Sequence, residues 1–178
     1  MAYRGTNTKQ GFFAKDFNIR DTLSSHVGIL LYEDSDWLIY NVNNFKDGLS
    51  DFRYQNLKEF YAIEQEKINY ACIYEVSSIK RNQKKILIKG FHKLKRVSIK
   101  FDKRFLLDNP YRLYCSEFVR NALYHLDSVN LNFQTHKREL KGIYKTYFRK
   151  DSLEYYPVDI FQLNPNLKKI KHWSFPRY

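Results

Sequence analysis

The clearest hydrophobic pattern in the chain lies between Tyr111 and Leu126. Its apolar residues follow one another at steps of one, three, one and three, which is the spacing of one helix face. They are Phe118, Val119, Ala122, Leu123 and Leu126. Pro110 marks a turn before this segment and Asp127 opens a loop after it. The pattern predicts a helix with one buried face that begins at or just after Cys115.

A second pattern, near the N-terminus, is typical of β-structure. The runs 24–32 and 37–43 are rich in β-branched and aromatic residues, and four polar residues at 33–36 separate them. Two such runs around a short polar turn predict an antiparallel hairpin. His26 opens the first strand. Gly28 lies two residues further on the same strand face, where the lack of a side chain leaves room for a close approach.

Weaker patterns predict the other elements. The first 22 residues predict a loop with one short element, and residues 43–48 predict another loop. A short helix is expected over 56–66, and strands over 68–76, 84–88 and 96–101, with a bend at Gly90. Residues 130–147 show no clear period. Residues 155–170 predict a turn, one helical turn and a final strand.

Length and composition indicate a single globular domain spanning residues 1–178. The chain has 15 Tyr and 14 Phe but only 6 Gly and 4 Pro, so it is neither disordered nor collagen-like. No linker rich in Pro, Gly or Ser divides it. Apolar runs are only a few residues long, and the segment Met1–Gly5 lacks the apolar core of a signal peptide. We therefore expect a cytoplasmic protein.

The formal net charge of +12 is the feature that most suggests an anionic partner. The basic residues are distributed over several segments: 80–85, 89–104, 137–150 and 168–171. None of these segments matches a zinc finger, a helix-turn-helix or a sheet-type RNA-binding signature. A solvated basic face is the simpler interpretation, and nucleic acid is not the expected partner. Peripheral contact with an acidic lipid surface is an alternative. The oligomeric state does not follow from the sequence.

Cys115 is the residue whose position most suggests chemistry. At a helix start, unpaired N–H groups and the helix dipole favour an anion, so a thiol there ionises more easily. Such a nucleophile also needs a base, most often a histidine folded against it. The competing interpretation is that Cys115 is an inert packing residue. Cys72 lies in a β-rich run without helix-start chemistry, and we expect it in the core.

Neither the cysteines nor the histidines suggest a metal site. Cys72 and Cys115 are too far apart for metal-ligand spacing. The remaining histidines form no cluster in sequence; they are His92, His125, His136 and His172. We expect no metal and no other cofactor.

Three short motifs in a particular order suggest a family. Residues 25–29 (SHVGI) come first, 114–119 (YCSEFV) later, and 156–160 (YPVDI) near the end. This order resembles the circularly permuted papain-like amidases, the YiiX/YebB-like group of the bacterial NlpC/P60 cell-wall peptidase superfamily. The resemblance covers roughly residues 23–170. It implies an α+β papain-like fold in which an antiparallel sheet packs against the helix that begins with the nucleophile.

The N-terminus departs from this family pattern. Relatives open with a Gly-Asp pair on a strand that precedes the histidine, and no such pair is evident here. The resemblance therefore implies an N-terminal part that has diverged or been shortened.

The resemblance also implies roles for individual residues. Cys115 would attack an acyl carbonyl, and His26 would hold its proton and pass it to the leaving group. A polar residue on the next strand would orient the imidazole; Asn41 is our choice, with Tyr40 as the alternative. The backbone N–H of Cys115 would hold the oxyanion. Further orienting or oxyanion candidates flank these positions: Ser25, Tyr114 and Ser116.

Two classes of function follow from this reading. The first is a cysteine hydrolase of the amidase, peptidase or acyltransferase type, which acts on a small-molecule, peptide or lipid acyl substrate. The second is a catalytically silent basic binding module for an anionic polymer or an acidic lipid surface. The module would keep its affinity when Cys115 is replaced, and its binding would weaken steeply with salt.

Overall fold

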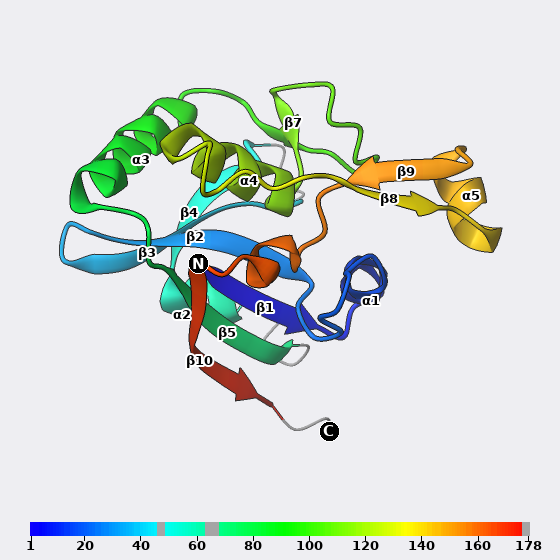
Figure 1. Ribbon diagram of the computed structural model, residues 1–178, viewed down its shortest axis with the longest axis horizontal. Helices are drawn as coiled ribbons and strands as arrows, with labels where there is room; N and C mark the ends of the chain where they lie inside the picture. Colours follow the sequence, from blue (N-terminus) through cyan, green and yellow to red (C-terminus); the bar gives the residue numbers. More distant parts are fainter. Residues whose placement is uncertain (46–48, 63–67, 176–178) are drawn as a thin grey trace.

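A six-stranded sheet is the centre of the molecule (Figure 1). The computed structural model describes residues 1–45, 49–62 and 68–175. Within them the strand order is β10-β5-β1-β2-β3-β4, and each neighbouring pair is antiparallel. The strands are β1 (Ala2–Thr6), β2 (His26–Glu33), β3 (Asp36–Val42), β4 (Phe52–Asn56), β5 (Ile68–Val76) and β10 (Leu167–Ser174). The mixed α+β class with a large antiparallel sheet is confirmed.

The hairpin of β2 and β3 is the best-predicted part of this sheet. Glu33 pairs with Asp36, so the connection consists of two residues. Those two residues, Asp34 and Ser35, both have positive φ, at 49° and 68°. Positive φ at both central positions defines the turn whose twist matches the flanking strands. The predicted hairpin and its polar turn are confirmed.

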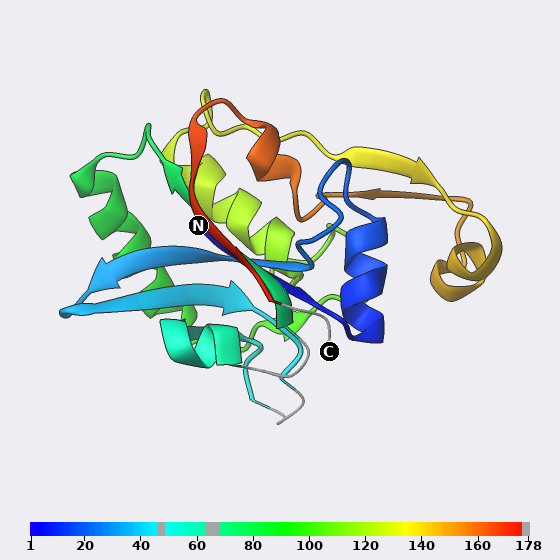
Figure 2. The same cartoon turned by 90° about the horizontal axis from the view of Figure 1, so that it is seen from below.

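Helices cover both faces of the sheet (Figures 1 and 2). On one face, α3 (Arg81–Leu94), α4 (Cys115–Leu126) and the 3₁₀ turn η2 (Ile160–Leu163) close the main core. Tyr3, Val27 and Ile29 point into that core from the sheet. On the other face, α2 (Leu57–Ala62) closes a smaller cluster through Phe60, which contacts Ile39. Successive strand residues thus serve different cores.

Residues 136–155 form a separate unit beside the sheet, which we call the arm. It consists of β8 (His136–Glu139), α5 (Gly142–Phe148) and β9 (Ser152–Tyr155), with β8 and β9 antiparallel. An aromatic cluster packs the arm against α1 (Lys9–Asp16) and the start of α4. Its buried members are Phe17, Tyr114, Leu140, Phe148, Leu153 and Tyr155.

The helix predicted to begin at Cys115 is confirmed. α4 runs from Cys115 to Leu126, and the apolar face predicted for it is turned to the core. The strand predicted for 68–76 is β5, and Cys72 is fully buried there. The turn, helical turn and strand predicted at the C-terminal end correspond to η2 and β10. The helix predicted over 56–66 begins as α2; residues 63–66 lie outside the described residues, as do 46–48 of the loop predicted at 43–48.

The strand predicted over 84–88 is wrong, because these residues belong to α3. The apolar run Ile86–Leu87–Ile88 resembles a strand locally. The core instead takes Leu87 and Phe91, which are one helical turn apart. The Lys80 N–H donates to Gln83 Oε1 at 2.8 Å and starts the helix. Gly90 therefore lies inside α3 and not at a bend.

Two further expectations need correction. The strand predicted over 96–101 is reduced to β6 (Lys100–Phe101), which pairs in parallel with β7 (Arg112–Leu113). The N-terminal segment was expected to be a loop with one short element, but it forms β1 and α1. β1 lies between β5 and β2 in the sheet. β1 pairs with β2, the strand that His26 opens, and it contains no Gly-Asp pair.

Gly28 makes the approach of β2 to β3 possible. A Cβ at this position would lie 2.7 Å from Ile39 Cγ2 and 3.1 Å from Asn41 Cβ. We expect Gly28→Ala to lower the free energy of unfolding by roughly 1–3 kcal/mol, the usual cost of overpacking. Urea unfolding of the two proteins measures this difference.

Gly90 supplies the matched control for this experiment. A Cβ there meets no atom within 4 Å, and the residue lies within α3. Gly90→Ala should therefore raise stability by about 0.5–1 kcal/mol through helix propensity. Equal effects of the two substitutions would contradict the close packing at Gly28.

Candidate functional site

The start of α4 is held by the short parallel pair of β6 and β7. The Asp102 N–H donates to the Leu113 carbonyl at 3.0 Å, which fixes β7 two residues before Cys115. Tyr114 is the N-cap residue in extended conformation, and its carbonyl accepts the first helical bond from Phe118 N–H at 3.0 Å. Cys115 is therefore the first residue of the helix, as the sequence pattern predicted.

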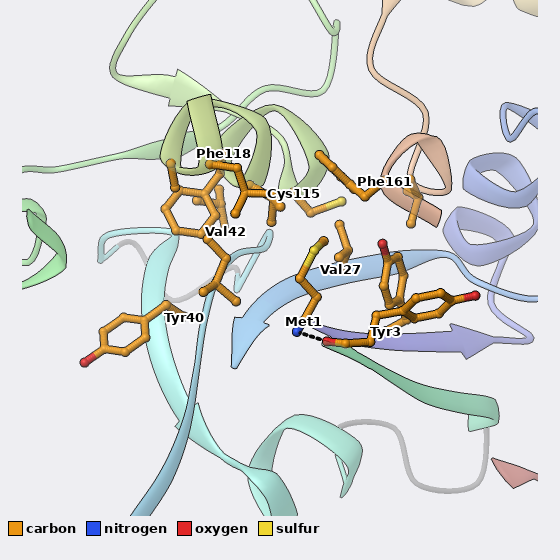
Figure 3. Packing of buried hydrophobic residues seen from close by; sticks show 14 of the residues in the cluster. Met1, Tyr3, Val27, Tyr40, Val42, Cys115, Phe118 and Phe161 are labelled. Carbon is orange, nitrogen blue, oxygen red and sulfur yellow. Dashed lines mark hydrogen bonds between the residues drawn. The ribbon is translucent and has the colours of Figure 1, made fainter. Parts of the chain in front are cut away.

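The Cys115 thiol faces the core and not open solvent. The residue is 6% exposed and belongs to the main core cluster. Figure 3 shows its side chain between the start of α4 and Val27, with Phe161 close by. Burial raises the pKa of the Cys115 thiol. The backbone N–H groups of Val27 and Ser116 oppose this effect, because they stabilise the thiolate.

His26 lies at the start of β2, and its side chain is hydrogen-bonded to that of Asn41. Its Nε2 and the Asn41 Oδ1 are 3.1 Å apart, and both residues are buried. Asn41 is the third catalytic candidate chosen from the sequence, and the structure places it beside His26 as expected. The Asn41 amide is held in turn by Gln55 on β4, to whose Oε1 its Nδ2 donates at 3.0 Å.

These two hydrogen bonds determine the tautomer of His26. Because Asn41 Nδ2 donates to Gln55, its Oδ1 faces the imidazole. An amide oxygen only accepts, so the His26 Nε2 bears the hydrogen and Nδ1 keeps the lone pair. Burial lowers the pKa of His26 to about 3, with the Arg4 charge acting in the same direction and the Asn41 bond against it. The ring is therefore neutral at neutral pH.

Arg4 is a buried cation beside this network. It pairs with His26 across β1 and β2 and is 4% exposed. Its Nη1 donates to the Phe60 carbonyl at 2.5 Å, and its Cζ lies 4.7 Å from the centre of the Phe60 ring. The His26 ring lies 5.7 Å from the same ring. The Arg4 charge also lowers the pKa of Cys115, so one guanidinium acts on both candidate residues.

In the described structure, the side chains of Cys115 and His26 share no hydrogen bond. Cys115 packs in the α4 core with Val27, the residue that follows His26. The imidazole lies with Asn41 and Phe60, on the side of the sheet that α2 covers. The structure thus brings His26 and Asn41 together and places Cys115 against the neighbouring backbone.

The flanking candidates have structural partners. Ser25, the residue before β2, is hydrogen-bonded to β1. Its N–H donates to the Arg4 carbonyl at 2.9 Å, and its Oγ accepts from the Thr6 N–H at 3.2 Å. The Ser116 hydroxyl donates to the Tyr156 carbonyl at 2.7 Å. The Tyr114 hydroxyl accepts from Tyr156 N–H at 2.8 Å. The last two contacts join the second and third sequence motifs.

Tyr40, the alternative orienting candidate, lies away from His26, and Asn41 is the residue beside the imidazole. Tyr40 follows Ile39 and precedes Asn41, so strand alternation turns its side chain to the opposite face. There its ring packs 4.7 Å from that of Phe91, and its hydroxyl donates to Glu33.

Glu117, one residue beyond Ser116, was not singled out by the sequence. It is 5% exposed, and burial raises the pKa of its carboxyl group to about 8. The Tyr114 N–H hydrogen bonds to this carboxyl group and opposes the shift. Glu117 is thus largely neutral at neutral pH and caps the helix that begins at Cys115.

Arg4 and Gln55 are the site residues that sequence reasoning missed. Each lies on a strand that local pattern did not predict, β1 and β4. Neither belongs to one of the three motifs. Only the pairing of β1 with β2 and of β3 with β4 brings them to His26 and Asn41.

The described residues provide no metal-binding cluster. Nowhere in them do three or more His, Cys, Asp or Glu residues come together. Glu33 and His92 form a pair in which Oε1 and Nε2 are 2.5 Å apart. The Tyr40 hydroxyl also donates to Glu33. Two such residues do not make a ligand set of the usual number.

Comparisons with known proteins give one structural relationship and no sequence relationship. The chain superposes on the crystal structure of the metalloprotein YiiX from Escherichia coli O157:H7, described as DUF1105, with a TM-score of 0.70. The match covers 96% of this chain and 93% of that one at 14% identity, and it shows that the two share a fold. No family model matches the sequence. No curated protein matches it either.

No helix in the described part of the chain is both long enough and apolar enough to cross a bilayer.

The pKa of His26 predicts how stability depends on pH. The value is about 3 in the folded protein against 6.5 as the ordinary value, so the unfolded chain binds more protons between these limits. Stability should therefore fall as pH decreases from about 6.5 toward 3. His26→Gln, which keeps an amide donor for Asn41, should reduce this fall. Urea unfolding at pH 7 and pH 4.5 measures it.

His125→Gln is the control, because His125 is exposed on α4. This variant should retain the pH dependence of the unmodified protein. A pH dependence that is the same in both variants would show that His26 does not cause it.

Proposed function

We propose that the protein is a cysteine hydrolase or acyltransferase in which Cys115 attacks the acyl carbonyl of an amide, ester or thioester. The observation that supports this most directly is the His26–Asn41 bond, which leaves Nδ1 of a neutral imidazole as a proton acceptor. The position of Cys115 at the first residue of α4 adds a thiol at a helix N-terminus. The shared fold with YiiX is compatible with this proposal.

The proposed reaction has two stages. In the first, His26 Nδ1 takes the thiol proton as Cys115 Sγ attacks the carbonyl carbon, which gives a tetrahedral oxyanion. The oxyanion collapses to a thioester, and the imidazolium gives its proton to the departing amine, alcohol or thiol. In the second stage, water or another acyl acceptor loses a proton to His26 and attacks the thioester. The second tetrahedral oxyanion collapses, and Cys115 leaves as a thiolate that takes the proton back from the imidazolium.

Burial determines the resting state of this pair. It raises the pKa of the Cys115 thiol and lowers that of His26 to about 3, so both groups are neutral before substrate binds. Proton transfer then accompanies attack and does not precede it. The Cys115 thiol lies on the α4 side of the sheet and the His26 imidazole on the α2 side, so the reaction requires a rearrangement at the start of β2 that brings Nδ1 to the thiol or to a water between them. Catalytic hydrogen bonds often tighten only when substrate is bound.

Arg4 has an electrostatic role in this proposal. Its charge favours the Cys115 thiolate and any oxyanion formed from it, and it disfavours the imidazolium of His26. The bond to the Phe60 carbonyl and the Phe60 ring hold the guanidinium in place. Arg4 would therefore assist the reaction through the effect of its own charge on Cys115 and His26, without touching the substrate.

The nucleophile can be tested with an activated ester. Incubation with p-nitrophenyl acetate should produce an acetyl thioester on Cys115, visible by intact mass and peptide mapping. Cys115→Ala should abolish it. His26→Ala should lower the rate by about 100-fold or more, the usual contribution of a general base.

Cys72→Ser is the matched control, because Cys72 is the other free, buried cysteine. Its acetylation rate should equal that of the unmodified protein. Acetylation that persists in Cys115→Ala, or that is unchanged in His26→Ala, would exclude the proposed pair.

The role of Arg4 is tested by the pH dependence of thiol alkylation. In a Cys72→Ser background, Arg4→Met should move the alkylation midpoint of Cys115 to higher pH by up to about one unit, because a nearby positive charge is lost. Arg4→Lys keeps the charge and should restore most of the shift. Equal midpoints in the Met and Lys variants, with circular dichroism showing both folded, would contradict an electrostatic role.

A further inference from the structure

The tip of the arm exposes apolar side chains that have no role in the proposed reaction. On α5, Ile143 is 77% exposed and Tyr147, one helical turn further, is 59% exposed. We call these two residues, with the cations described below, the arm tip. One turn apart on the same helix, they give α5 an apolar outer face.

The arm tip is firmly attached to the body of the protein. Phe13 of α1 lies 5.2 Å from the Tyr144 ring and 5.6 Å from the Tyr147 ring, between centroids. Phe148, on the inner side of α5, is buried. Arg138 of β8 forms an ion pair with Asp16 of α1, in which Nη2 and Oδ2 are 3.1 Å apart. The exposed side chains are therefore presented by a packed surface.

The charges around the arm tip are mainly positive. Lys141, Arg149 and Lys150 are exposed at the two ends of α5. The nearby acid Asp151 is paired with Lys145 at 2.6 Å. Asp16 is paired with Arg138. Among the described residues, neither of these ion pairs involves the three cations at the helix ends. Glu139 is exposed two residues before Lys141, so these three cations outnumber that further acid.

We propose that the arm tip docks on the surface of a bilayer that contains anionic lipids. Ile143 would enter the boundary with the acyl chains, Tyr147 would lie at the headgroup level, and the cations would contact lipid phosphates. A lipid surface fits better than RNA because RNA offers no partner for an exposed aliphatic side chain. This inference does not depend on the proposed reaction.

The place of α5 in the molecule suits such contact. Figures 1 and 2, at right angles to each other, both show α5 at one end of the long axis, beyond the sheet. A flat surface can therefore meet the arm tip without touching β1–β5. α3 lies at the other end in both views, which makes it a suitable place for control substitutions.

The test is co-sedimentation of the full chain with vesicles of phosphatidylcholine, with and without phosphatidylserine. We expect binding only to the vesicles that contain phosphatidylserine. Ile143→Ser should weaken it by about tenfold, the effect of losing one buried aliphatic side chain. The double variant Lys141→Glu/Lys150→Glu should weaken it by at least about 25-fold, since each cation near such a surface contributes roughly fivefold.

The matched controls are on α3. Ile86 is 61% exposed there, and Lys85 and Lys89 are exposed on the same helix. Ile86→Ser and Lys85→Glu/Lys89→Glu should leave binding within about twofold of the unmodified protein. Equal losses in the α3 and α5 variants would show a general effect of charge and would overturn the proposal. So would absence of vesicle binding, or binding to a single-stranded RNA with the same sensitivity to the α5 substitutions and none to vesicles.

Discussion

The packing of α4 against the sheet is the constraint on which the other features of the site depend. Phe118, Val119 and Leu123 join the main core, while β6 and β7 determine where the helix begins. The same packing places the Cys115 thiol against the backbone of Val27 and removes it from solvent. The packing of α4 on the sheet therefore both positions the Cys115 thiol and buries it. Burial raises the pKa of this thiol, while the N–H groups of Val27 and Ser116, the Ser116 side chain and the charge of Arg4 act in the other direction.

The sheet separates two kinds of interaction. Residues of β2 alternate between its faces, so Val27 enters the α4 core and His26 enters the polar network with Asn41. Gly28 allows β3 to come close enough for that network. In the proposed reaction Cys115 and His26 would meet at the beginning of β2, where His26 and Val27 follow one another.

The relationship to YiiX shows how little of a sequence a fold requires. At 14% identity the two chains share an architecture over nearly their full lengths. Cores accept many combinations of apolar residues when volume and pattern are kept, so a sheet and its covering helices persist after most identities are lost. Activity depends on specific side chains in specific places, and a common fold does not transmit it. The proposals for Cys115, His26 and Asn41 accordingly rest on the contacts within this chain.

The sequence by itself determined the elements whose periodicity is strong and local. The hairpin of β2 and β3 and the helix from Cys115 to Leu126 could be predicted, because alternation and helical spacing are properties of neighbouring residues. Which of Asn41 and Tyr40 lies beside His26 depends on strand register, which the sequence pattern does not give. The strand predicted over 84–88 was wrong because the apolar run 86–88 is locally compatible with either a strand or a helix. Only the burial of Leu87 and Phe91 on one face shows that it is helical.

Only the tertiary structure decided which distant residues meet. The contacts of Arg4 with His26, of Gln55 with Asn41 and of Cys115 with Val27 arise from the pairing of strands and the docking of a helix far apart in sequence. So does the aromatic packing that exposes Ile143 at the end of the arm. Burial, and with it the pKa values of the thiol and the imidazole, is a property of the assembled fold, because it depends on what surrounds each group in three dimensions.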